Sequence, residues 1–141
     1  MKGQFLIRLP EQEKLIITAS VGFISPHDNN QLYVAIRNER GWDIPGGHVE
    51  ENETPIQAFK RELKEETQCI LLPNARPIAL LESRTTGNTG IVVYRGFCLV
   101  KPFAPTEEIL ERKIFSTDEL IDNYFGDKDI FKILIGLCRQ K

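Results

Sequence analysis

Alternating apolar and polar positions predict several β-strands along most of the chain. Residues 31–37 place Leu32, Val34 and Ile36 on one side, which is the two-residue period of a half-buried strand. Residues 15–25 are rich in β-branched side chains and are also expected to be extended. Three further runs have strand character: residues 70–72, 78–83 and 91–100.

Clusters of turn-forming residues separate these runs. They contain Pro, Asp, Asn and Gly and cover residues 26–30, 38–41 and 87–90. Residues 42–44 are expected to form a short extended piece that stops at Pro45, Gly46 and Gly47. The last two strands are expected to be joined across the turn at 87–90.

A helix is expected to begin after Thr54. Thr54 suits the N-cap, and Pro55 suits the first helical position, where a missing N–H costs nothing. Ile56, Phe59 and Leu63 then recur at three- and four-residue spacing, so they are expected to form the buried stripe of this helix.

The last third of the chain predicts two more helices. Ser116 or Thr117 caps a short one through Leu120, and an amphipathic one runs from about Asp129 to Arg139. The apolar residues expected to be buried by the second are Ile130, Phe131, Leu134, Ile135 and Cys138. Strands on both sides of a central helix predict the α/β or α+β class: a layered sandwich with a mixed β-sheet.

Length and composition fit one soluble domain covering residues 1–141, with 41% hydrophobic and 27% charged residues. The net charge of −2 does not favour nucleic acid or an anionic membrane as a partner, since both call for a basic field. An anionic substrate would need local cations instead. No apolar run approaches the ~18 residues of a membrane span, and no signal peptide is recognised.

The three cysteines, Cys69, Cys98 and Cys138, are far apart and form no CxxC or zinc spacing. The expectation is that they are small buried hydrophobes in a reducing compartment, which favours a cytoplasmic location.

Three glutamates crowd one face of the central helix. Glu65 and Glu66 follow Glu62 by three and four residues, a spacing at which like charges repel by a few tenths of a kcal/mol per pair. A hard divalent cation such as Mg²⁺ would offset this repulsion, because it binds a few carboxylates while keeping waters and substrate phosphates. The alternative interpretation is a solvated acidic helix face.

The glutamates fall in a spaced pattern that resembles the Nudix box, G-x5-E-x7-R-E-U-x-E-E-x-G-U, where U is apolar. From Gly47 the chain has five residues, then Glu53, seven more residues, and then Arg61-Glu62-Leu63-Lys64-Glu65-Glu66. The match ends at Cys69 and has one departure, Gln68 in place of glycine. Glycine there would serve a left-handed helix cap, so either Gln68 tolerates about 1 kcal/mol of strain or the helix ends differently.

The resemblance implies a Nudix-like α/β/α sandwich and a MutT-like pyrophosphohydrolase. Such enzymes use Mg²⁺ or Mn²⁺ and attack by water on phosphorus to cleave a nucleoside diphosphate linked to another moiety. Glu62, Glu65 and Glu66 match the catalytic, metal-binding glutamates, with Glu66 as the principal ligand and Glu62 also a candidate general base. The backbone carbonyl of Gly47 would be a further ligand.

Other residues are candidates for binding metal or substrate, and each could instead be an ordinary surface or core residue. Relatives often have one more metal-binding glutamate beyond the box, which favours Glu108 over Glu107; the alternative is an exposed loop charge. His48, Arg37 and Arg84 are candidates to bind substrate phosphate, or are simply exposed. The aromatic residues that could stack on a base are Phe23, Trp42 and Tyr94, although the core is favoured for the first and the last.

The substrate is expected to be a nucleoside triphosphate, by elimination. Residues 84–87 lack the proline that accompanies ADP-ribose hydrolysis and the tyrosine that accompanies dinucleoside polyphosphates. Two other classes stay open: a Nudix-fold nucleotide-binding module with weak or no catalysis, and an unrelated cation-binding or protein-interaction domain with an acidic helix. A homodimer is possible.

Overall fold

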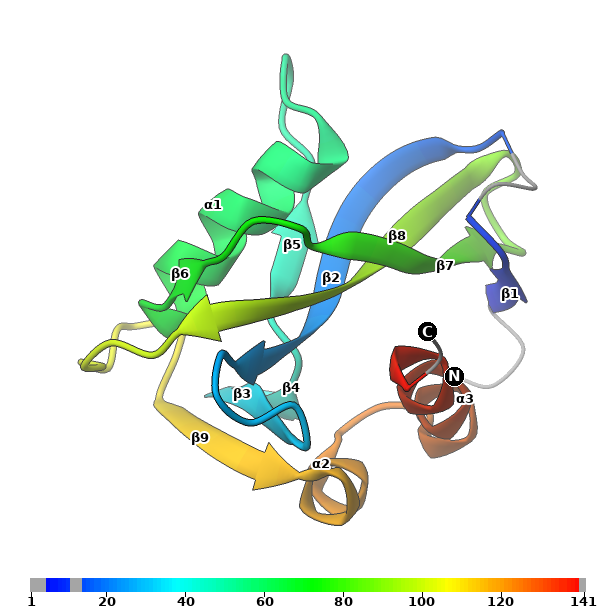
Figure 1. The fold of residues 1–141 in the computed structure, drawn as a ribbon. Helices are drawn as coiled ribbons and strands as arrows, with labels where there is room; N and C mark the ends of the chain where they lie inside the picture. The colour runs from blue at the N-terminus through cyan, green and yellow to red at the C-terminus, as the bar shows by residue number, and fades with distance from the viewer. Residues whose placement is uncertain (1–4, 11–13, 140–141) are drawn as a thin grey trace.

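The computed structural model describes residues 5–10 and 14–139, which form two β-sheets and three helices (Figure 1). The larger sheet has the strand order β1-β7-β8-β2-β5, with β6 paired to β8, and the smaller has the order β4-β3-β9. The strands of the larger sheet are β1 (Phe5–Arg8), β2 (Ile16–Pro26), β5 (Gly46–His48), β6 (Ile70–Leu71), β7 (Arg76–Ser83) and β8 (Thr89–Leu99). Those of the smaller sheet are β3 (Leu32–Asn38), β4 (Gly41–Asp43) and β9 (Glu111–Ser116).

The two long strands β2 and β8 form the centre of the larger sheet and run parallel, whereas their other neighbours run antiparallel. Successive side chains on a strand point to opposite faces. Phe23 therefore enters one core with Val93, while the next residue, Ile24, enters a second core with Val92. The sheet is mixed, as predicted, and has a hydrophobic core on each face.

Helices cover both faces. Helix α1 (Pro55–Thr67) supplies Phe59 and Leu63 to the core around Ile24. Helices α2 (Thr117–Asn123) and α3 (Lys128–Cys138) supply Leu120 and Phe131 to the core around Phe23. Figure 1 shows α1 and α3 on opposite sides of the long strands. The predicted α/β/α sandwich is thus confirmed, and none of the described helices is long and apolar enough to cross a bilayer.

Helix α1 begins as its sequence predicts. The Thr54 side chain accepts a hydrogen bond from the Gln57 N–H, the Gln57 side chain bonds back to the Thr54 N–H, and Pro55 occupies the first turn. The prediction that Ile56 is buried is wrong, because its side chain is 37% exposed. The buried residues of α1 are Ala58, Phe59, Leu63 and Thr67, whereas Ile56 shares their face but lies in the first turn, at the end of the helix.

Three strands differ from the expectation. Gly46 and Gly47, which were expected with Pro45 to stop an extended piece, belong to strand β5, which pairs with β2. Strand β1 was not predicted because it is a short apolar run that gains its partner only from β7. Strand β9 was not predicted because it begins with three charged residues, Glu111, Arg112 and Lys113, that interrupt any apolar alternation.

The residues left open between core and binding roles are resolved in part. Phe23 is fully buried and Tyr94 is 7% exposed, so both belong to the cores, while Trp42 is partly buried against Phe115. Cys69, Cys98 and Cys138 are buried free thiols, as expected.

Candidate active site

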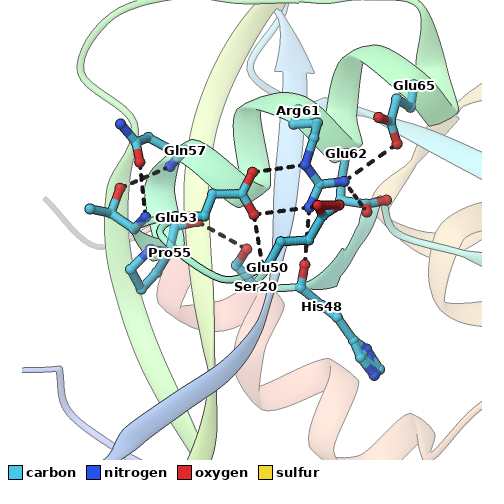
Figure 2. A network of polar contacts seen from close by, with 10 residues as sticks. Ser20, His48, Glu50, Glu53, Pro55, Gln57, Arg61, Glu62 and Glu65 are labelled. Carbon is cyan, nitrogen blue, oxygen red and sulfur yellow. Dashed lines mark hydrogen bonds and ion pairs between the residues drawn. The ribbon is translucent and has the colours of Figure 1, made fainter.

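Arg61 is the centre of a polar network that joins helix α1 to the loop before it (Figure 2). Its Nε and Nη2 donate to the two oxygens of Glu53, at 2.8 and 3.0 Å. Nη2 also donates to the His48 carbonyl at 3.1 Å, and Nη1 donates to Glu62 at 2.7 Å. Because bidentate guanidinium–carboxylate bonds are directional, this network fixes the register between the β5 loop and the helix. The bonded guanidinium holds the pKa of Glu53 down at about 2.

Gly47 lies against the carboxylate of Glu62. A Cβ at position 47 would be only 2.6 Å from Cδ and 2.8 Å from Oε1 of Glu62, closer than atoms can approach. The pairing of β5 with Ser20 on β2 holds this backbone in place. The arrangement therefore brings a main-chain segment and a carboxylate within reach of one small ligand, and a Cβ at position 47 would require the Glu62 carboxylate to shift.

Glu66 is a largely buried carboxylate one helical turn further along. Its Oε1 accepts a hydrogen bond from the Gly46 N–H at 2.8 Å. Burial first, and then the nearby carboxylates of Glu62, Asp43 and Glu108, raise the pKa of Glu66 to about 8, against this hydrogen bond, which lowers it. The carboxylates of Glu62, Asp43 and Glu108 thus act on that of Glu66. A bound cation would offset this repulsion.

Glu108 reaches the same place from the loop before β9. A cavity of about 580 Å³ is lined by Asn38, Glu39, Arg40, Glu66, Glu107, Glu108 and Ile109. The loop is held by hydrogen bonds from Leu110 N–H to the Arg37 carbonyl, at 2.8 Å, and from Ile109 N–H to Thr106 Oγ1, at 3.0 Å. The structure therefore brings together Gly47, Glu62, Glu66 and Glu108, which the sequence placed up to 61 residues apart.

The other sequence candidates lie differently. Glu65 is 58% exposed, and its carboxylate is 3.4 Å from Arg61 Nη1. His48 is exposed and its ring points away from Arg61 (Figure 2). Arg37 pairs with Glu111 at 2.7 Å, and Arg84 is exposed between β7 and β8 and is not among the described residues that line the cavity of Glu66 and Glu108.

Sequence reasoning missed one residue, Asp43, and one contact, that of Gln68 with Ala104. Asp43 is partly buried, which raises its pKa to about 6, and its charge adds to the acidic field at Glu66. The available signal was a single acid between the apolar residues Trp42 and Ile44, three positions before Gly46.

Gln68 forms the contact that sequence reasoning missed, with Ala104. It has a left-handed backbone, with φ of 61°, and its N–H donates to the Lys64 carbonyl at 3.0 Å. Its side-chain amide forms two hydrogen bonds with Ala104, Nε2 to the carbonyl at 2.8 Å and Oε1 from the N–H at 3.0 Å. The end of α1 is thereby tied to the loop that contains Glu108.

The donors at this site have the chemistry of a hard-cation site. They are carboxylate and carbonyl oxygens, which Mg²⁺ prefers, and they include a buried acid beside like charges. Within residues 5–10 and 14–139, however, no three acidic, His or Cys side chains are already gathered as a metal-binding group. Glu62 is bonded to Arg61 instead, so a cation would have to compete with the guanidinium.

The fold is a mixed sheet between helices, and the glutamates of α1 lie against the glycines of β5. These two features are those of the family that its spaced motif resembles. The model of the NUDIX domain matches residues 17–134. The chain therefore belongs to the Nudix family, as its box predicts.

Two curated relatives match parts of the chain. An 8-oxo-dGTP diphosphatase of Proteus vulgaris is 43% identical over 72 residues, covering 44% of this chain and 62% of that protein. An RNA pyrophosphohydrolase of Halorhodospira halophila is 46% identical over 48 residues, covering 33% of this chain and 26% of that protein. The chain thus spans less than two-thirds of the length of either relative.

Solved structures resemble the chain over more of its length. A UDP-X diphosphatase has a TM-score of 0.67 at 21% identity and covers 89% of this chain and 62% of its own. A MutT protein from Methanosarcina mazei Go1 has a TM-score of 0.65 at 18% identity and covers 92% of this chain and 100% of its own. At these identities the resemblance establishes the fold alone.

Proposed function

We propose that the chain is a Mg²⁺- or Mn²⁺-dependent pyrophosphohydrolase that cleaves a nucleoside diphosphate linked to another moiety. The observation that carries the proposal is the convergence of Glu66, Glu62 and Glu108 beside the glycine strand, with a pKa of about 8 at Glu66. A buried acid beside other acids fits a cation site better than it fits a solvated helix face.

The residues that would hold the metal are Gly47, through its carbonyl, Glu62, Glu65, Glu66 and Glu108. When bound, the ion supplies polarisation of phosphoryl oxygens and a lower pKa of attacking water. Glu66 is the principal ligand in this assignment because its carboxylate lies in the field of Glu62, Asp43 and Glu108. Glu65 would contribute from the exposed side of the helix.

Glu62 would accept the proton of the attacking water. Arg61 donates to it at 2.7 Å, which orients the carboxylate. Glu53 in turn fixes Arg61 through two hydrogen bonds. Glu53 and Arg61 are therefore positioning residues, and the substrate does not need to touch them.

Phosphate groups of the substrate would be bound by His48, Arg37 and Arg84. His48 has the most direct route, since it follows Gly47 on β5. Arg37 is on β3 beside the loop of Glu108 and would have to share its guanidinium with Glu111. Arg84 would have to reach the substrate from the β7–β8 connection.

A nucleoside triphosphate is the leading substrate, in keeping with the Proteus relative, whose name states action on 8-oxo-dGTP. The second candidate is the 5′ end of RNA, since the Halorhodospira relative is named an RNA pyrophosphohydrolase. The net charge of −2 favours the free nucleotide over a polynucleotide. We propose further that residues 1–141 form one Nudix domain and that the hydrolase acts in the cytoplasm. A homodimer is the proposed assembly.

The test is phosphate or pyrophosphate release from a substrate panel with Mg²⁺, Mn²⁺ and EDTA. The panel contains nucleoside triphosphates, 8-oxo-dGTP, sugar nucleotides, dinucleoside polyphosphates, ADP-ribose and 5′-triphosphorylated RNA. Glu66→Gln should lower kcat by about two orders of magnitude or more without lowering the unfolding temperature. Glu107→Gln, which changes an exposed acid of the same cavity, is the control and should keep most of the activity.

Two results would contradict the proposed hydrolase activity. Metal-dependent nucleotide binding without product release favours the nucleotide-binding module. Unfolding of Glu66→Gln with no metal effect on the wild type assigns Glu66 a structural role and favours the unrelated acidic domain.

A further inference from the structure

Arg40 is the one cation among the described residues that line the acidic cavity. The other charged residues of this lining are Glu39, Glu66, Glu107 and Glu108, so four carboxylates face a single guanidinium. A polyphosphate that enters the cavity brings further negative charge, and guanidinium groups bind phosphate oxygens through paired N–H donors. The position of Arg40 is therefore the place to look for a substrate contact.

The guanidinium of Arg40 keeps its N–H donors available. The residue is exposed, and within residues 5–10 and 14–139 its side chain has no hydrogen bond or ion pair. Arg37 differs, because its Nε and Nη2 lie 2.8 and 2.7 Å from Oε1 of Glu111. A phosphate at Arg37 would compete with this carboxylate, whereas a phosphate at Arg40 would displace only water.

The turn between β3 and β4 fixes the backbone of Arg40. Its N–H donates to Asn38 Oδ1 at 2.9 Å, and Asn38 also lines the cavity. The next residue, Gly41, has a φ of +129°, which side-chain-bearing residues rarely adopt. A Cβ on Gly41 would be 3.2 Å from the Cβ of Phe125, so the turn lies close against the segment after α2.

Phe125 supports the guanidinium from that segment. The Cζ of Arg40 is 5.1 Å from the centre of the Phe125 ring, a cation–π contact that uses none of the N–H donors. Phe125 itself is fixed, since its N–H donates to the Trp42 carbonyl at 3.0 Å and Tyr124 forms a bridge with Trp42. The charge of Arg40 is thus held in place while its hydrogen-bonding edge stays open.

The guanidinium is also close to the acids around Glu66. Burial raises the pKa of Asp43, and the charge of Arg40 opposes that rise, which places the two groups near each other. Asp43 in turn acts on Glu66. Arg40 therefore lies at the edge of the acidic field, on the side of the β3–β4 turn.

We propose that Arg40 binds a phosphate group of the substrate at the acidic cavity, with Phe125 orienting its guanidinium. This inference rests on the proposed function, because the phosphate in question belongs to the diphosphate that the hydrolase cleaves. Arg40 would offset phosphate charge on the side of the cavity that the glutamates leave without a cation. Among the arginines, it takes precedence over Arg37 and Arg84 as the phosphate ligand.

The test is a calorimetric titration of the full-length protein with methylenediphosphonate at a fixed Mg²⁺ concentration. This probe has the shape of pyrophosphate and is not hydrolysed, so it measures binding without turnover. Arg40→Gln should weaken binding roughly tenfold, and Arg40→Lys, which keeps the charge but loses the planar fork, should weaken it less. Phe125→Leu removes the cation–π support and should weaken binding about two- to fivefold.

Two further variants make the result specific to Arg40. Arg37→Gln should weaken binding less than Arg40→Gln does, because Glu111 already occupies the Arg37 guanidinium. Lys132→Gln removes the same charge from the exposed face of α3, outside the cavity, and should bind as wild type. The inference is overturned if Arg40→Gln binds the probe as wild type does, if wild type does not bind it, or if Arg37→Gln loses more affinity.

Steady-state kinetics with a nucleoside triphosphate separates this inference from the proposed function. Arg40→Gln should raise KM about tenfold with little change in kcat, since a contact made equally in the ground and transition states affects binding alone. If wild type binds the probe but hydrolyses no substrate of the panel, the hydrolase proposal fails and the phosphate contact stands. If wild type is active and Arg40→Gln has the same KM, the role of Arg40 fails alone.

Discussion

Gly47 shows how a single missing side chain shapes the candidate active site. A methyl group there would overlap Glu62, whose carboxylate is also fixed by Arg61. We expect Gly47→Ala to displace Glu62 and to lower kcat by about 100-fold, since a shift of ~1 Å in a reacting group has this effect. Gly87→Ala is the matched control, because a Cβ there meets nothing within 4 Å. Equal activity of the two variants would remove Glu62 from the mechanism.

Glu53 gives a pH prediction for stability. Its pKa falls from 4.5 to about 2 in the folded state, first because Arg61 bonds to its ionised form. A lowered folded-state pKa stabilises the protein above the unfolded value of 4.5, and this contribution disappears as the pH falls toward 2. Glu53→Gln should therefore be less stable than the wild type at pH 7, and the difference should shrink between pH 4.5 and about 2.

Urea unfolding at a series of pH values measures this difference directly. Glu51→Gln, on the same loop and exposed, is the control and should follow the wild type at each pH. A difference between Glu53→Gln and wild type that is constant with pH would mean that the ion pair with Arg61 contributes nothing to folding.

At the scale of elements, Gln68 decides how α1 ends. Its left-handed backbone is strained, but its amide forms two hydrogen bonds with Ala104. Gln68→Ala keeps the strain and loses both bonds, so it should destabilise the protein by about 1–2 kcal/mol. Gln68→Gly loses the bonds but relieves about 1 kcal/mol of strain, so its stability should be close to that of wild type.

Hydrogen exchange separates the two effects of Gln68. Both variants should speed exchange in the loop at 101–110, because both release Ala104 from α1. Thermal unfolding should be lowered in Gln68→Ala alone. Unchanged exchange at this loop in both variants would show that the amide bonds to Ala104 do not hold it.

The elements also show which parts of the fold can be predicted from sequence. Helix α1 and strands β2, β3 and β8 were predicted because their caps and periods are local. Strand β9 was missed because its six paired residues are defined by β3, some 80 positions away, and not by their own pattern. The Gln68–Ala104 contact was unpredictable for the same reason, since the path of the loop after β8 is fixed by tertiary contacts.

The residues of the candidate site also differ in whether local sequence spacing could predict them. The spacing of the box placed Glu62 and Glu66 on one helix beside Gly47, and the geometry brings these residues together. Asp43 was missed because its role depends on burial next to Glu66, which no spacing reveals. The exposure of Ile56 shows the converse, that an apolar residue in a helical period need not be buried.

At the scale of the whole molecule, the two cores share the strands β2 and β8, so helices on opposite faces depend on the same sheet. The acidic site is built where α1, β5 and the loop before β9 meet, and it gathers Glu62, Glu66, Asp43 and Glu108 in one field. Their mutual repulsion is a cost to the folded state that a bound cation would remove. Stability of the whole chain should therefore report on metal binding.

We expect Mg²⁺ at about 100 times its dissociation constant to stabilise the folded protein by about 2.7 kcal/mol. For a chain of this size the unfolding temperature should rise by roughly 5–10 °C, and EDTA should reverse the rise. Glu66→Gln should be at least as stable as wild type in EDTA, because burial and like charges oppose the carboxylate that it replaces. In Mg²⁺ the order should invert, since the amide is a poorer ligand. Calorimetry of both proteins, with NaCl at equal ionic strength as the control, measures this inversion, and parallel curves for the two proteins would exclude Glu66 as a metal ligand.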